Sequence, residues 1–341
     1  MRLLQHLQTT TDVLSLLVSC GSIAAATLFS SGQEPGNYVS SSSTSSESAA
    51  VACLAYVFNP LTLLAVGSGQ LVLNAAIALA FAVASGGMIS TTVALVVGLA
   101  ATVPIQGLCL GPPLLLLSWA RRRLLGSAHI LVDAGGLCVV AAVAISLPDS
   151  VWYPSLALHS VNTSTLAVSW PPELGLSWYL LSSAYIRYLP YFATLVWLHP
   201  FAYVTPVALR LHAYPAAAAV VTLCLACLFD PSDAYSLVRA PLCMSLALTL
   251  NGAVREMRDC TIVLGVLAVV LAVAPTIKSA WIVAPYGNAN LLFNLQLVFA
   301  LCGGLLTAEF AAGALRAVRA ERRYLRSNER VVHSVQRPCA Q

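Results

Sequence analysis

The chain has 341 residues, of which 59% are hydrophobic and only 9% are charged. Soluble globular domains carry about 25% charged residues, so this composition excludes a soluble domain and indicates a membrane protein. The formal net charge of +4 comes mainly from short arginine clusters between apolar runs, which favours a role in membrane orientation over nucleic-acid binding.

The apolar runs predict an all-α polytopic membrane protein with about eleven transmembrane helices, since each run approaches the length that spans a bilayer. No strand-like alternation of a membrane barrel is visible. Asn59 and Pro60 interrupt the second run, and Gly107 and Gly111 form a small-xxx-small pair that suggests close helix contact. In chain order, the runs cover residues 12–29, 49–67, 71–85, 89–103, 105–119, 129–147, 189–209, 214–229, 234–252, 261–276 and 291–312.

Three polar segments interrupt or follow this membrane domain, which we assign to residues 1–320. Residues 32–48 are Ser-rich and are predicted to form a flexible cytoplasmic loop. Residues 148–188 form a lumenal loop with an amphipathic segment, and this loop carries a glycosylation sequon at Asn162. Residues 321–341 are predicted to form a basic cytoplasmic tail.

The arginine clusters set the expected topology. Counted against the spans, residues 121–123, Arg210, the pair Arg255 and Arg258, and residues 316–330 all fall on one side. That side is cytoplasmic by the positive-inside rule. The sequon loop, residues 230–233 and residues 286–290 then fall on the lumenal side. The N-terminus does so too, and we therefore expect an upstream span to be missing from this chain.

The polar residues give little support for catalysis. No nucleophile lies at a recognisable spacing from a histidine, and the cysteines lie mostly inside apolar runs, including Cys224 and Cys227. We therefore predict neither a metal site nor a cofactor. Two alternatives stay open: Asp233 either caps a helix or belongs to a catalytic turn, and Glu309 either pairs with Arg316 or faces a polar lipid or a partner subunit.

Two amides, Asn288 and Asn290, precede the last apolar run. Lipid tails offer no hydrogen bonds, so these side chains must face protein, water or a polar headgroup. One interpretation is that they cap the helix. The other is that they bind a lipid headgroup, with Phe293, three residues after Asn290 and on the same helix face, bordering its acyl chains.

Four short islands resemble the U subunit (PIG-U) family of the glycosylphosphatidylinositol (GPI) transamidase. The first contains Asn59 and Pro60, the third contains Asp233 and Tyr235, and the fourth contains Gly287. The islands are residues 56–64, 175–179, 231–235 and 287–293, and the likeness extends over residues 5–320.

This resemblance implies a multi-pass protein of the endoplasmic reticulum membrane with a bundle like that of GT-C mannosyltransferases and a cytoplasmic C-terminus. It implies a noncatalytic subunit that binds the GPI lipid and presents it for attachment to precursor proteins. The implied partners are a cysteine-protease-like catalytic subunit, the subunits K, S and T, and a further membrane subunit. The alternative is a GT-C mannosyltransferase of GPI biosynthesis, which is expected to carry an acidic motif on its first lumenal loop.

Overall fold

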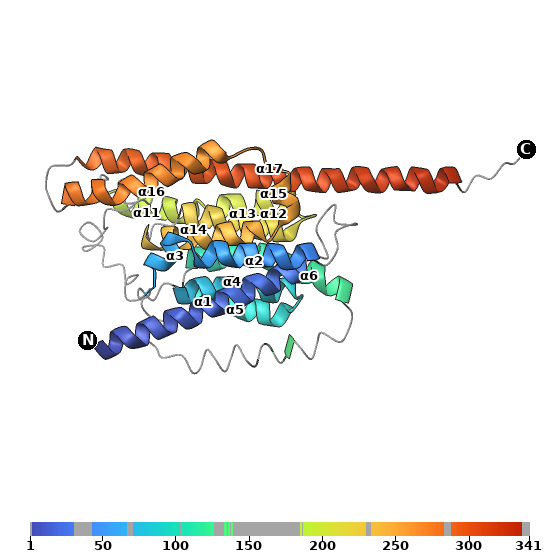
Figure 1. Ribbon diagram of the computed structural model, residues 1–341, viewed down its shortest axis with the longest axis horizontal. Helices are drawn as coiled ribbons and strands as arrows, with labels where there is room; N and C mark the ends of the chain where they lie inside the picture. The colour runs from blue at the N-terminus through green and yellow to red at the C-terminus, as the bar shows by residue number, and fades with distance from the viewer. Residues whose placement is uncertain are drawn as a thin grey trace, which may run out of the picture.

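The chain folds into a bundle of helices, most of which run side by side along the long axis of the molecule (Figure 1). The computed structural model describes residues 2–30, 43–66, 71–102, 104–125, 133–134, 136, 138, 185, 187–229, 233–282 and 288–335, and no strand occurs in this part of the chain. The helices are α1 (Arg2–Ser30), α2 (Ser43–Val57), α3 (Pro60–Leu64), α4 (Leu71–Ser85), α5 (Ile89–Thr102), α6 (Pro104–Leu125), α11 (Leu189–Leu198), α12 (Phe201–Arg210), α13 (Pro215–Leu228), α14 (Asp233–Leu248), α15 (Asn251–Arg255), α16 (Thr261–Ile282) and α17 (Ala289–Val335).

Within the described residues, three segments are long and apolar enough to cross a membrane: Thr10–Leu28, Thr261–Trp281 and Ala289–Ser327. Shorter apolar helices, including α4, α5 and α13, accompany them. The outer face of α16 exposes apolar side chains such as Ile262 and Val269, as a lipid-facing helix does. The predicted all-α membrane class is confirmed. The number of spans and the likeness to a GT-C bundle stay predictions, and most of the predicted run 129–147 lies outside the described residues.

Several helix boundaries follow the sequence signals. α4 occupies residues 71–85 as predicted. The predicted break at Asn59 and Pro60 is confirmed, because the Asn59 side chain accepts a hydrogen bond from the backbone nitrogen of Leu61 at 3.0 Å and caps α3. Pro60 occupies the first helical position, where its missing N–H group removes no intrahelical bond.

Other boundaries differ from the prediction. The run 189–209 is divided into α11 and α12, because Pro200 has no N–H to continue the ladder although its backbone stays helical. The run 234–252 is divided at Leu250, whose φ of −103° and ψ of 67° are not helical. α2 begins at Ser43, so residues 43–48 are helical where the sequence predicted the end of a loop. The rest of that loop lies outside the described residues.

The longest element is α17, with 47 residues. Its helix continues through residues 321–335, which the sequence analysis predicted as a separate tail. The reason is local: no glycine or proline occurs from Ala314 to Val335, and this stretch is rich in strong helix formers. At 1.5 Å per residue, α17 is about 70 Å long, more than twice the thickness of a hydrocarbon core. Figure 1 shows it extending well past the end of the bundle.

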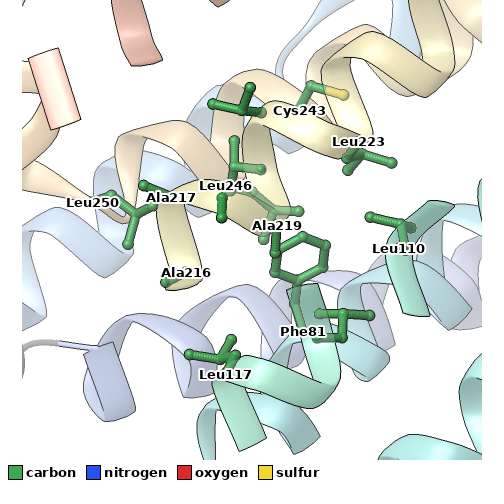
Figure 2. Packing of buried hydrophobic residues seen from close by; sticks show 14 of the residues in the cluster. Phe81, Leu110, Leu117, Ala216, Ala217, Ala219, Leu223, Cys243, Leu246 and Leu250 are labelled. Carbon is green, nitrogen blue, oxygen red and sulfur yellow. The ribbon is translucent and has the colours of Figure 1, made fainter. Parts of the chain in front are cut away.

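The hydrophobic core is centred on α13. Four consecutive alanines, Ala216 to Ala219, are buried, and their small side chains allow α6, α14 and α17 to pack closely around this helix. Figure 2 shows Phe81 of α4 and Leu110 of α6 at this core. Cys227 is buried in α13 with its sulfur 3.9 Å from that of Cys243, so it packs in the core, as predicted.

The close helix contact predicted from Gly107 and Gly111 is confirmed between α5 and α6. A Cβ atom built at Gly107 would overlap the backbone of Ala100. One built at Gly111 would lie 3.2 Å from the Cγ1 atom of Val96. A larger residue at Gly107 would therefore force α6 away from α5.

The two ends of the bundle differ in charge. α6, α12 and α15 each carry arginine near their C-terminal ends, and Figure 1 places α12 and α15 toward the end from which α17 leaves the bundle. We call this the basic end, defined by Arg122, Arg210, Arg255 and Arg316. The N-terminus and the start of α17 lie toward the opposite end (Figure 1).

Candidate functional site

The start of α17 is formed by an asparagine cap. The Oδ1 atom of Asn288 accepts a hydrogen bond from the backbone nitrogen of Asn290 at 3.0 Å, and its carbonyl oxygen accepts one from the nitrogen of Leu291 at 3.0 Å. The capping interpretation of Asn288 is therefore confirmed. The cap uses only oxygen atoms of this exposed residue, so its amide Nδ2 can still donate hydrogen bonds outward.

Asn290 and Phe293 lie in the first turns of α17. Asn290 is exposed, whereas Phe293 is half-buried. Because both residues lie in one regular helix, their spacing of three places them on neighbouring positions of its surface, as the sequence predicted. The structure thus brings two exposed amides and one aromatic ring together at one end of the bundle.

A small apolar cluster between α16 and α17 positions these residues. Leu292 is buried against Val270 and Ala274 of α16, with Trp281 packed beside them. The neighbouring Leu291 points outward and is 51% exposed. The inward-facing leucine therefore fixes the rotation of α17 about its own axis, and this rotation decides which of the following residues face the bundle.

Gln296 was missed by the sequence analysis. It lies on α17 one turn beyond Leu292, its side chain is 0% exposed, and neither amide atom has a hydrogen-bond partner within the described structure. A buried polar group left without a partner costs about 1–3 kcal/mol. The available signal was a glutamine inside the apolar run 291–312, but its burial depends on the rotation of α17.

The other residues singled out from the sequence lie elsewhere. Asn59 and Pro60 form the start of α3. α14 begins at Asp233 and includes Tyr235 in its first turn. Asn162 and Gly287 lie outside the described residues, as does most of the loop 148–188. Within the described residues, these islands thus lie at the starts of three different helices, α3, α14 and α17.

Glu309 joins α17 to the turn between α15 and α16. Its carboxylate pairs with Arg316 and accepts a hydrogen bond from the backbone nitrogen of Arg258 at 2.9 Å. The Nε atom of Arg316 also donates to the carbonyl oxygen of Glu256 at 2.7 Å. Of the two interpretations of Glu309, the pairing with Arg316 is therefore confirmed, and we call this group the Glu309 clasp.

Asp259, in the same turn, caps α16. Its Oδ1 atom accepts hydrogen bonds from the hydroxyl group and the backbone nitrogen of Thr261, the latter at 2.9 Å. These two hydrogen bonds hold the pKa of the Asp259 carboxyl below its ordinary value. The cap thus fixes where α16 begins, next to the clasp that holds α17.

No group of three metal-ligating side chains is found among the described residues. The chemistry that the start of α17 can perform is hydrogen bonding, since carboxamides both donate and accept without carrying charge. Such groups suit a ligand with hydroxyl, phosphate or carbonyl oxygens at a membrane surface.

Comparison with protein-family models matches residues 2–299 to the family described as GPI transamidase subunit PIG-U. The matched residues include the Asn288 cap and Gln296. A search among curated proteins finds no match.

Proposed function

Because the chain belongs to the PIG-U family of GPI transamidase subunits, we propose that it binds the GPI lipid at the start of α17 and presents it for attachment to precursor proteins. Family membership implies a multi-pass protein of the endoplasmic reticulum membrane and implies the other transamidase subunits as its partners. We further propose that these are K, S, T and a fifth membrane subunit, with the catalytic step on another chain.

The observation that carries the lipid proposal is the amide pair beside a half-buried aromatic ring. Asn288 and Asn290 are exposed at the end of an apolar helix, where the headgroup of a membrane lipid meets its acyl chains. A GPI glycan and its phosphate offer many oxygen atoms to such donors. Phe293, one turn further along the helix, is suited to contact the first carbons of an acyl chain.

The position of this pair also supports the proposal. The start of α17 lies toward the end of the bundle opposite the basic end (Figure 1). By the positive-inside rule, the basic end faces the cytoplasm, so the amides face the lumen. We expect the lipid to be presented on that face, where the precursor proteins are anchored.

The test is the double variant Asn288→Ala/Asn290→Ala, expressed with the other subunits in cells that lack the native chain. We expect labelling of the chain by a photoactivatable GPI analogue to fall several-fold, and anchored reporter protein at the cell surface to fall with it. Recovery of the complex should stay unchanged. Asn251→Ala is the matched control, since it removes an amide at the start of α15, toward the basic end.

Two outcomes would contradict this proposal. If the double variant lowered the recovery of the complex while the complex that still formed kept full labelling, the asparagines would serve only as a cap or a subunit interface. If the purified chain transferred mannose from a dolichol-linked donor, the protein would be a GT-C transferase instead.

A further inference from the structure

Gln296 is a polar side chain that the fold itself leaves unexplained. It is fully buried, and both its amide oxygen and its amide nitrogen lack a hydrogen-bond partner among the described residues. Its neighbours along the bundle-facing stripe of α17, Leu292 and Ala300, are apolar and also buried. A leucine at this position would fill similar space without any unmet polar group. Packing alone therefore gives no reason for a glutamine here.

The residue lies at the inner end of a row that begins at the proposed lipid site. Asn290, Phe293 and Gln296 follow one another at intervals of three, so each is a neighbour of the next on the helix surface. Their burial rises along the row, from exposed through half-buried to fully buried. The row thus leads from the end of the bundle into its interior.

The depth of Gln296 indicates which part of a lipid it can reach. Six residues separate it from Asn290, which is about 9 Å along the helix axis. The polar layer on each side of a bilayer is about 5–8 Å thick, measured as half the difference between the full and the hydrocarbon thickness. If Asn290 lies level with the headgroup, Gln296 lies level with the glycerol unit and its linkages to the acyl chains.

We propose that Gln296 is a lipid-binding residue whose amide donates a hydrogen bond to a carbonyl or hydroxyl oxygen of the lipid's glycerol unit. This proposal rests on the proposed function and adds to it a second, deeper polar contact. The lipid's glycerol unit enters beside the half-buried Phe293 ring and supplies the partner that Gln296 lacks. The two amides at the end of α17 then bind the headgroup, and Gln296 fixes how deep the lipid is held.

The experiment compares Gln296→Leu with wild type in the assembled, detergent-purified complex. The probe is a photoactivatable diacyl glycosylphosphatidylinositol, and the melting temperature of the complex is measured in the same samples. We expect labelling to fall at least three-fold while the melting temperature stays equal or rises, because the variant removes an unmet polar group. Gln296→Met, which keeps the unbranched shape, should behave in the same way if Gln296→Leu does not assemble.

Thr62→Val is the matched control. Thr62 on α3 is also fully buried, and its hydroxyl has no hydrogen-bond partner within the described structure. This change therefore also removes a buried polar group without a partner, but from a helix other than α17. We expect it to leave labelling unchanged.

The outcomes separate this inference from the proposed function. Labelling equal to wild type in Gln296→Leu, as expected if the amide meets only an enclosed water, would overturn the inference. If the double asparagine variant lost labelling in the same assay, the proposed function would still stand. A parallel loss of melting temperature and labelling in both Gln296 variants would mean a structural role, and unchanged labelling in all variants would overturn both proposals.

Discussion

Gly87 occupies a turn at the basic end of the bundle where only a residue without a side chain fits. It lies in the turn between α4 and α5 with a φ of +78°, a left-handed conformation that glycine adopts without steric cost. A Cβ atom at this position would lie 3.2 Å from the backbone nitrogen of Arg122 and 3.3 Å from the Cβ atom of Arg121. The turn therefore excludes a side chain both by its backbone conformation and by the neighbouring end of α6.

We expect Gly87→Ala to lower the free energy of unfolding by about 1–2 kcal/mol from the left-handed backbone alone. The contact with α6 adds to this loss. Gly265→Ala is the matched control, because nothing lies within 4 Å of a Cβ atom at that position and alanine is favoured inside a helix. Thermal unfolding in detergent measures both variants. An unchanged melting temperature for Gly87→Ala would show that the turn can move away from α6.

At the same scale, the sequence predicted some roles of single residues and not others. The break at Asn59 and Pro60 and the Asn288 cap could be predicted, because a proline inside an apolar run and an asparagine just before one are local signals. The burial of Gln296 could not, because it depends on how α17 is rotated against α16. That rotation is set by the packing of Leu292 against residues of the neighbouring helix. The sequence around Gln296 alone therefore does not predict it.

Among the elements, α17 and the α15–α16 turn are held together by the Glu309 clasp. The clasp combines an ion pair with backbone hydrogen bonds from two segments about fifty residues apart. The side chains of Glu309 and Arg316 are partly exposed, which is typical of a group at the edge of the membrane rather than at its centre. The clasp therefore ties the last two long apolar helices at their basic end, while the Leu292 cluster ties them near the other.

We expect Arg316→Gln to lower the melting temperature, because it leaves the Glu309 carboxylate without its counter-charge. The double variant Arg316→Gln/Glu309→Gln should lose less than the sum of the two single variants, since the two groups act as a pair. Arg319→Gln removes an exposed arginine one turn further along and serves as the control. Strictly additive losses in this double-mutant cycle would show that the pair is not coupled.

The elements also show where patterns of composition stop being informative. α4 was predicted to the residue because Gly86 and Gly87 end its apolar run. α17 was predicted too short, because the change from apolar to arginine-rich residues was interpreted as the end of the helix. Composition changes where the membrane ends, whereas a helix ends where a breaker or a cap interrupts its hydrogen bonds, and no glycine or proline occurs between Ala314 and Val335.

For the whole molecule, the separation of charge between the two ends is the main asymmetry. Arginines from α6, α12 and α15 lie near the ends of their helices, and the basic end contains the Glu309 clasp. The sequence predicted this grouping by counting the arginine clusters against the apolar runs. The grouping follows from helices that cross the bundle in alternating directions, as the short turn between α4 and α5 requires.

This asymmetry predicts the orientation of the chain in microsomes. The prediction can be tested with a variant of the chain from which the native reactive cysteines have been removed. A cysteine in place of Ser327, an exposed residue on the extension of α17, should react with a membrane-impermeant thiol reagent in intact microsomes. A cysteine in place of Ser160, beside the sequon at Asn162, should react only after permeabilisation. Labelling in the opposite order would reverse the assigned topology.

Because α17 is one unbroken helix, a tilt of the helix displaces both of its ends. The backbone of α17 comes close to that of α15 near the middle of the helix, where a Cβ atom at Gly313 would lie 2.5 Å from the carbonyl oxygen of Ala253. The arms on either side of Gly313 are about 36 Å and 33 Å long at 1.5 Å per residue. A tilt of about 5° around that point therefore moves the Asn288 end and the arginine-rich end by about 3 Å each, in opposite directions. In the orientation that the positive-inside rule predicts, a displacement of the Asn288 end on the lumenal side would therefore be accompanied by an opposite displacement of the arginine-rich end on the cytoplasmic side.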